Sequence, residues 1–86
     1  MPLTDAQIEE LANTPVGSTG NRLARAIEML GVRQIDVAEA TGLAQPYISD
    51  VVRGRHETIT VENAHKFARF TGADIKILFP EKAVAA

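Results

Sequence analysis

Apolar side chains recur along most of this chain at the spacing of an α-helix, and no run alternates for long enough to suggest a strand. The clearest stripe is Leu23, Ile27 and Leu30, at positions i, i+4 and i+7. Gly31, directly after them, is a natural helix end. We therefore expect a helix over about residues 18–30, buried along this stripe.

Further helices follow from apolar spacing, capping residues and helix breakers. They are expected over about residues 4–12, 34–40, 45–53, 61–71 and 75–79. The helix at 61–71 would bury Val61, Ala64, Phe67 and Ala68, with His65 partly buried beside them. The pattern is typical of the all-α class.

The stretch QIDVAEATGLAQPYISDVVR, residues 34–53, carries the strongest functional signal. Two helices that meet at a steep angle need a small residue where they cross, and a residue that tolerates positive φ between them. Ala38 and Gly42 supply these, while Ile48 and Val51 would pin the second helix to the core. The pattern predicts a helix-turn-helix with these four residues as its structural centre.

The second helix of this motif has an apolar back and a short polar front. At about 100° per residue, Ile48 and Val51 share the back. The front is formed by Gln45, Pro46, Ser49 and Asp50. Gln can pair with adenine, Ser can bond several base edges, Asp can accept from cytosine, and Pro can touch a thymine methyl group. This front favours a helix that reads bases in the major groove of DNA.

The chain resembles the phage-repressor/Cro-like (xenobiotic-response-element) helix-turn-helix family from about Asn21 to Pro80. The resemblance rests on Gln34, on the core residues Ala38, Gly42 and Ile48, and on the segments QPYISDVVRG and TVENAHKFARFTGADIKILFP. It implies a five-helix lambda-repressor-like DNA-binding domain, here with an extra short N-terminal helix. Family members regulate transcription, usually as repressor dimers on palindromic operators.

The resemblance also implies phosphate contacts around the base-reading front. The expected set is Arg33, Gln34, Tyr47, Arg53, Arg55 and His56. Gln34 would present the N-terminus of its helix to a phosphate, and Tyr47 would touch the backbone through its hydroxyl. Arg33 stands where the family often has a Ser or Thr cap, so it would replace that cap with a phosphate contact.

Another departure from the family is the apolar pair Ile27 and Val52, where phage members tend to have an Arg–Glu pair. Replacing both partners of a buried ion pair is often neutral or stabilising, whereas replacing one would strand a charge. The joint change therefore supports the alignment.

Charge is small and unevenly distributed. The formal net charge of −2 argues mildly against DNA, because phosphate contacts favour basic proteins. Residues 1–16 hold three acids and no base, whereas residues 17–72 hold seven bases and six acids. Specific contacts would therefore have to supply much of the affinity. The lack of cysteine, of a long apolar run and of a basic leader fits a cytoplasmic protein, bacterial or phage-encoded.

The 86 residues are enough for one core. We expect a helical extension and linker over 1–16, the helix-turn-helix domain over 17–80 and a frayed tail over 81–86. Ile8 and Leu11 fit either a dimerisation arm or a flap over the core. A second apolar cluster fits either a dimer interface or a core plug: Ile75, Leu78 and Phe79.

Two functions remain in competition. The leading one is a homodimeric transcriptional regulator, a repressor by preference, bound to double-stranded DNA. The alternative is an antitoxin or other protein-binding module that captures a partner through its acidic N-terminal helix and uses the helix-turn-helix for autoregulation. We expect no enzymatic activity, cofactor or membrane association, and His56 and His65 lack the neighbours of a metal site.

Overall fold

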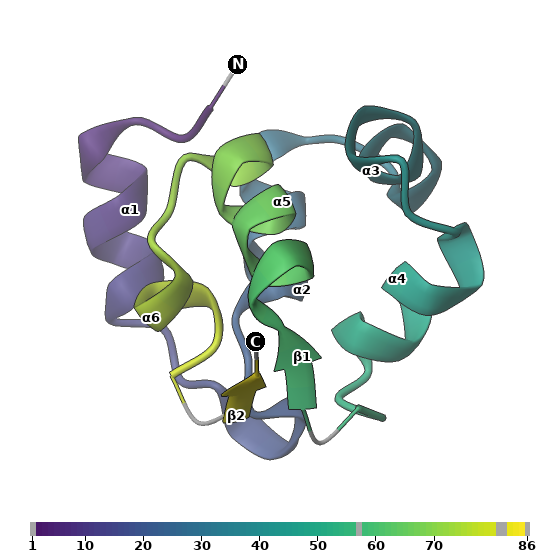
Figure 1. Ribbon diagram of the computed structural model, residues 1–86. Coiled ribbons are helices and arrows are strands. Elements are labelled where there is room, and N and C mark those ends of the chain that lie inside the picture. The colour runs from purple at the N-terminus through teal and green to yellow at the C-terminus, as the bar shows by residue number, and fades with distance from the viewer. Residues whose placement is uncertain (1, 57, 81–82, 86) are drawn as a thin grey trace.

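The computed structural model describes residues 2–56, 58–80 and 83–85, and most of them are helical. Figure 1 shows the elements, which are α1 (Asp5–Ala12), η1 (Gly17–Thr19), α2 (Leu23–Leu30), α3 (Gln34–Thr41), α4 (Gln45–Val52), β1 (Thr58–Thr60), α5 (Val61–Thr71), α6 (Ile75–Leu78) and β2 (Ala83–Ala85). The predicted all-α fold, five helices preceded by a short N-terminal one, is confirmed.

The start of α2 differs from the prediction. Residues 18–19 belong to η1, and Gly20 turns the chain with a φ of 72°. The side-chain oxygen of Asn21 accepts the Leu23 N–H at 3.0 Å, while its amide donates to the Val51 carbonyl at 2.9 Å. This buried amide satisfies a free N–H at the start of α2 and ties that helix to the end of α4.

Two strands of three residues each form a parallel pair, with Ile59 opposite Val84. The sequence predicts neither strand, and its prediction of a frayed tail is wrong for Ala83–Ala85. Ile59 is buried between the exposed Thr58 and Thr60, but three residues are too few to establish an alternating pattern. The partner strand also lies far along the chain, so nothing in the sequence near either strand indicates the pairing.

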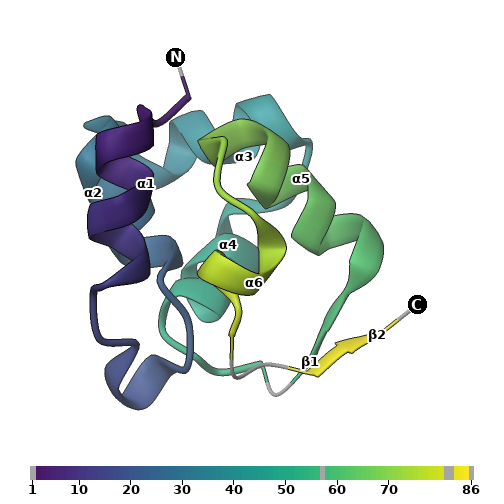
Figure 2. The same cartoon turned by 90° about the vertical axis from the view of Figure 1, so that its left-hand side faces the viewer.

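The core forms around α5, whose Phe67 is fully buried. In Figure 1, α1 lies on one side of α5 and α2, and α4 lies on the other; Figure 2 shows the molecule from the side of α1. Ile27 is buried and Val52 is half-buried against the same core. Two packed apolar side chains therefore stand where phage members of the family tend to have an Arg–Glu ion pair.

The N-terminal segment belongs to this core. Leu3 and Leu11 are buried, and the Leu3 N–H donates to the Thr71 carbonyl at 2.8 Å. Pro2 approaches Gly72 so closely that a Cβ added to the glycine would lie 2.8 Å from the Cβ of Pro2. Of the two alternatives for the N-terminal stripe, the structure therefore supports the flap over the core.

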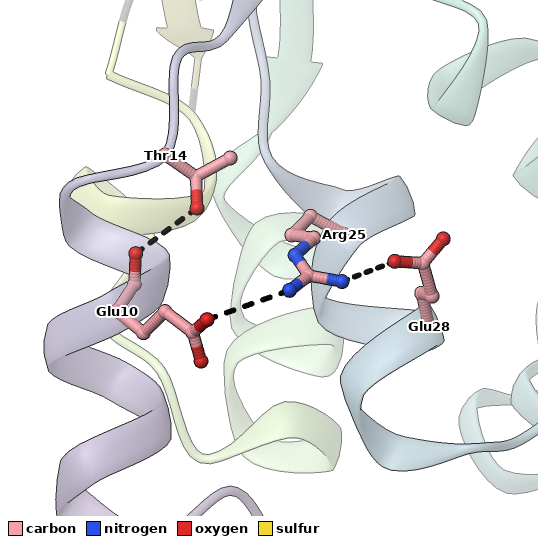
Figure 3. A network of polar contacts seen from close by, with 4 residues as sticks. All are labelled: Glu10, Thr14, Arg25 and Glu28. Atoms are coloured by element: carbon pink, nitrogen blue, oxygen red, sulfur yellow. Dashed lines mark hydrogen bonds and ion pairs between the residues drawn. The ribbon is translucent and has the colours of Figure 1, made fainter.

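A polar network also joins α1 to α2 on the surface (Figure 3). The Arg25 guanidinium lies between two carboxylates, pairing with Glu28 on its own helix and with Glu10 of α1 at 3.6 Å. The Thr14 hydroxyl donates to the Glu10 carbonyl at 3.0 Å. Exposed pairs of this kind contribute little, roughly 0–1 kcal/mol each, so burial of the two leucines dominates the attachment of α1.

The apolar cluster at residues 75–79 is mainly a core plug. Leu78 and Phe79 are buried, and the rings of Phe79 and Phe67 have centroids 6.0 Å apart. The Arg22 guanidinium donates to a carbonyl of α6 at 2.9 Å and so is engaged within the fold. Leu78 and Phe79 are therefore used within the fold, which supports the core plug for these two residues.

Two positions of α5 depart from the predicted stripe. Val61 is 36% exposed although the pattern places it inward, and His65 is exposed instead of partly buried.

Within the described residues, no helix is long and apolar enough to cross a membrane.

Candidate nucleic-acid interface

The turn between α3 and α4 depends on Gly42, which has a φ of 73° and donates its N–H to the Ala38 carbonyl at 2.9 Å. Only glycine adopts this left-handed conformation without steric cost. Beyond the turn, Ile48 and Val51 are buried and Ala38 is half-buried. These four residues hold α4 against the body of the molecule, where the sequence predicts the second helix of the motif.

The outward face of α4 carries the polar front. Gln45 and Pro46 are exposed, and Ser49 and Asp50 are half-exposed. Pro46 stands in the first turn, where its missing N–H leaves no hydrogen bond unmade. The structure therefore brings all four predicted base-reading residues to one accessible surface.

The C-terminal end of α4 is closed by a Schellman motif. The Gly54 N–H donates to the Val51 carbonyl at 3.0 Å, and the Arg55 N–H donates to the Asp50 carbonyl at 2.9 Å. Gly54 has a φ of 74°, and a Cβ added there would lie 2.6 Å from the backbone of Thr19. The loop after α4 is thus fixed both by its own hydrogen bonds and by close packing on η1.

This motif brings together two residues for which the sequence predicts separate roles. The Arg55 guanidinium pairs with the Asp50 carboxylate at 3.5 Å, with 64% and 40% of the two side chains exposed. The predicted phosphate contact and the predicted base contact are therefore neighbours on one surface.

Tyr47 connects α4 to α5. Its hydroxyl accepts a hydrogen bond from the Asn63 side-chain amide at 3.1 Å, and its ring lies 5.0 Å from the His56 ring. The hydroxyl hydrogen remains able to donate, so the bond is compatible with the predicted phosphate contact. The sequence does not indicate this role of Asn63, because its partner Tyr47 lies on another helix.

At the start of α3, Arg33 is exposed and Gln34 half-exposed. An arginine side chain has no acceptor and cannot cap a helix, and no side-chain cap is present here. Instead, the Asp36 carboxylate accepts the Arg33 backbone N–H at 2.9 Å and pairs with the Arg33 guanidinium at 3.3 Å. Asp36, which the sequence does not single out, thus gives half of a capping box.

This contact shifts the ionisation of both groups. Hydrogen bonds from the Arg33 side chain and backbone lower the pKa of Asp36, and the hydrogen bond with Asp36 raises the pKa of Arg33. The guanidinium remains largely exposed, so the pair is compatible with a predicted phosphate contact at this corner.

Exposed arginines stand at both ends of the motif: Arg33, Arg53 and Arg55. Together with the polar front of α4, they form a surface that can face a nucleic acid. A separate open hollow of about 400 Å³ lies between the end of α3 and α5, and none of the predicted contact residues lines it. No group of acidic or histidine side chains in the described parts of the chain could hold a metal ion.

Comparison with known families agrees with this geometry. The helix-turn-helix family model matches residues 23–78, from the first residue of α2 to the last of α6. The chain belongs to the helix-turn-helix family. The Cro-like resemblance is thereby confirmed, and this helix-turn-helix protein is a DNA-binding regulator in the general sense. No curated protein and no solved structure matches the chain.

The matched segment leaves out α1, which the structure shows packed into the same core. The two parts share one hydrophobic interior, and the division into a helical extension and linker over 1–16 and a helix-turn-helix domain over 17–80 stays a prediction.

Proposed function

We propose that this helix-turn-helix protein is a transcriptional repressor that binds a palindromic operator as a homodimer. The observation that supports the proposal is the front of α4, where Gln45, Pro46, Ser49 and Asp50 are accessible together while the opposite face is buried. A helix with this division can enter the major groove and present hydrogen-bonding groups to base edges.

The proposed phosphate contacts surround this front. They are Arg33, Gln34, Tyr47, Arg53, Arg55 and His56. Phosphate contacts fix register and orientation but carry no sequence information directly. With a formal net charge of −2, the protein would bind non-specific DNA weakly and depend on its base contacts. We place this activity in the cytoplasm of a bacterium or an infected host, without catalysis or cofactor.

Selection of bound sequences from a random DNA pool at about 0.15 M salt tests the proposal. The expected product is a palindrome whose half-sites are about one helical turn, roughly 34 Å, apart. A single half-site would refute the homodimer, and recovery of random sequence would refute sequence-specific binding.

The acidic helix α1 supports a second candidate, an antitoxin-like module that also captures a partner protein. Asp5 and Glu9 are exposed residues of α1, and α1 lies across the core from α4, so one molecule could hold DNA and a protein together. Deleting residues 1–16 would be a poor test, because it removes the buried Leu3 and Leu11.

The better test is the double variant Asp5→Asn/Glu9→Gln, which removes two of the three negative charges of α1 and leaves both the buried leucines and the Glu10–Arg25 pair in place. The candidate expects a co-purifying basic partner to be lost while operator binding persists. Retention of every co-purifying protein by the variant would count against it.

A further inference from the structure

We infer that Arg55 reads a guanine within the major groove and that Asp50 acts through it as a positioning residue. The inference rests on the proposed function, because it names a base that the same surface recognises. It replaces the separate roles predicted from the sequence, a phosphate contact for Arg55 and a cytosine contact for Asp50.

The first support is the closure of α4. In a Schellman motif, the N–H of the residue two positions after the helix cap bonds the carbonyl of the third residue from the helix end. An apolar contact usually joins the side chains of these two residues. Here these positions are Arg55 and Asp50, whose backbones are joined at 2.9 Å. An ion pair at 3.5 Å takes the place of the apolar contact.

The second support is where this closure leaves the guanidinium. At about 100° per residue, Asp50 lies about 160° from the buried Ile48 and about 40° from Pro46 around the axis of α4, so it belongs to the outward face of the helix. A guanidinium beside its carboxylate therefore lies next to the polar front of α4. Gly54 adds rigidity, because its close approach to Thr19 holds the loop in this path.

The third support is chemical. A lone carboxylate on this face would repel phosphates, and it could accept only from the amino groups of cytosine or adenine. Paired with an arginine, its charge is offset. The Asp50 contact uses Nη1 of Arg55, and a guanidinium has five N–H donors. The remaining donors can bond O6 and N7 of guanine, which is the commonest specific contact between a side chain and DNA.

The test is sequence selection with four variants of the full chain, followed by titration of the selected operator and of each single-base substitution in it. The variants are Asp50→Asn, Arg55→Lys, Arg55→Ala and the double variant Asp50→Asn/Arg55→Ala. The matched control is Glu28→Gln, which removes the carboxylate of another exposed arginine pair, on α2. Circular dichroism checks that each variant is folded.

The inference expects Asp50→Asn, Arg55→Ala and the double variant to lose preference for guanine at the same base pair of each half-site, by roughly tenfold. Arg55→Lys should lose less, because lysine can also bond O6 and N7 of guanine. The double variant should lose no more than Arg55→Ala alone, because the two residues form one unit. The control should select the unchanged operator.

Separate roles would produce a different result. Asp50→Asn would relax a base pair that Arg55→Ala leaves unchanged, and Arg55→Ala would weaken all sequences alike and reduce the salt slope by about 0.9. That result overturns the inference and leaves the proposed function standing. Failure of the unaltered protein to select any sequence would overturn both.

Discussion

Gly54 is constrained both by its backbone conformation and by a neighbouring segment. Its φ of 74° disfavours any other residue, and an added Cβ would lie 2.6 Å from the Thr19 backbone. Gly31 provides a matched control, because its φ is 70° and nothing lies within 4 Å of its Cβ position. We expect Gly31→Ala to cost about 1–2 kcal/mol and Gly54→Ala to cost clearly more. Urea denaturation of the two variants checks this, and equal losses would contradict it.

Asp36 makes stability depend on pH. Because its pKa is lowered in the folded protein, its stabilising effect is fully present above the pKa of the unfolded chain. It is lost as the pH falls through the lowered folded value. We therefore expect Asp36→Asn to be less stable than the unaltered protein at neutral pH and to approach it in strong acid. Urea denaturation from pH 7 down to about pH 2.5 measures the difference, and a gap that is constant with pH would refute the assignment.

Gln45 and Arg53 separate base reading from phosphate binding. Both are exposed, but only Gln45 lies at the leading end of α4. We expect Gln45→Ala to lose about 1–3 kcal/mol against one base pair of each half-site. Arg53→Ala should weaken all sequences alike and flatten the salt dependence. Binding titrations with operator and random DNA at several salt concentrations distinguish the two, and the same effect of both variants on both DNAs would contradict these roles.

Among the elements, α1 is held by burial more than by charge. Leu11 is fully buried, whereas Glu9 on the same helix is exposed. We expect Leu11→Ala to lower the free energy of unfolding by about 2–5 kcal/mol. Glu9→Ala should change it by less than about 0.5 kcal/mol. If thermal unfolding showed similar small effects for both, α1 would be a detachable arm.

The helices were predictable because their signals are local. Thr60 caps α5 by accepting the Asn63 N–H, and Gly72 ends it in the left-handed conformation, both as the sequence predicts. The start of α2 was predicted too early, because residues 17–19 form η1 and Asn21 is joined to the distant Val51, a contact that the local sequence does not show. The β1–β2 pair was missed for the same reason, because its partners lie far apart in the chain.

The candidate site was predictable as a surface but not as a set of contacts. Helical spacing places Gln45 and Ser49 on the exposed face of α4. The pairing of Asp50 with Arg55 depends on the path of the loop, and the bond between Tyr47 and Asn63 depends on how α4 packs against α5. Periodicity along one helix carries no information about either.

At the scale of the whole molecule, the acidic charges of α1 are kept away from α4. The molecule measures 28 × 26 × 21 Å, and the two helices lie on opposite sides of the core. At physiological salt the Debye length is about 8 Å, so α1 is screened from DNA bound at α4. At about 0.01 M salt it is about 30 Å, comparable to the molecule itself.

This arrangement predicts how Asp5→Asn/Glu9→Gln changes operator binding. We expect no measurable change in affinity at about 0.15 M salt and a tighter complex at about 0.01 M, because long-range repulsion then reaches the DNA. Titrations at the two concentrations measure it. A large change at physiological salt would place α1 close to the bound DNA.

The bond between Leu3 and Thr71 has a consequence for how the protein is made. During synthesis α1 and α2 are made before α5, so the Leu3 N–H has no Thr71 carbonyl to bond until α5 has also left the ribosome. Contacts between distant parts of a chain slow folding and leave apolar surface exposed in the meantime. Leu3 therefore stays without its native partner until α5 has been made, and the core of this domain closes only after that.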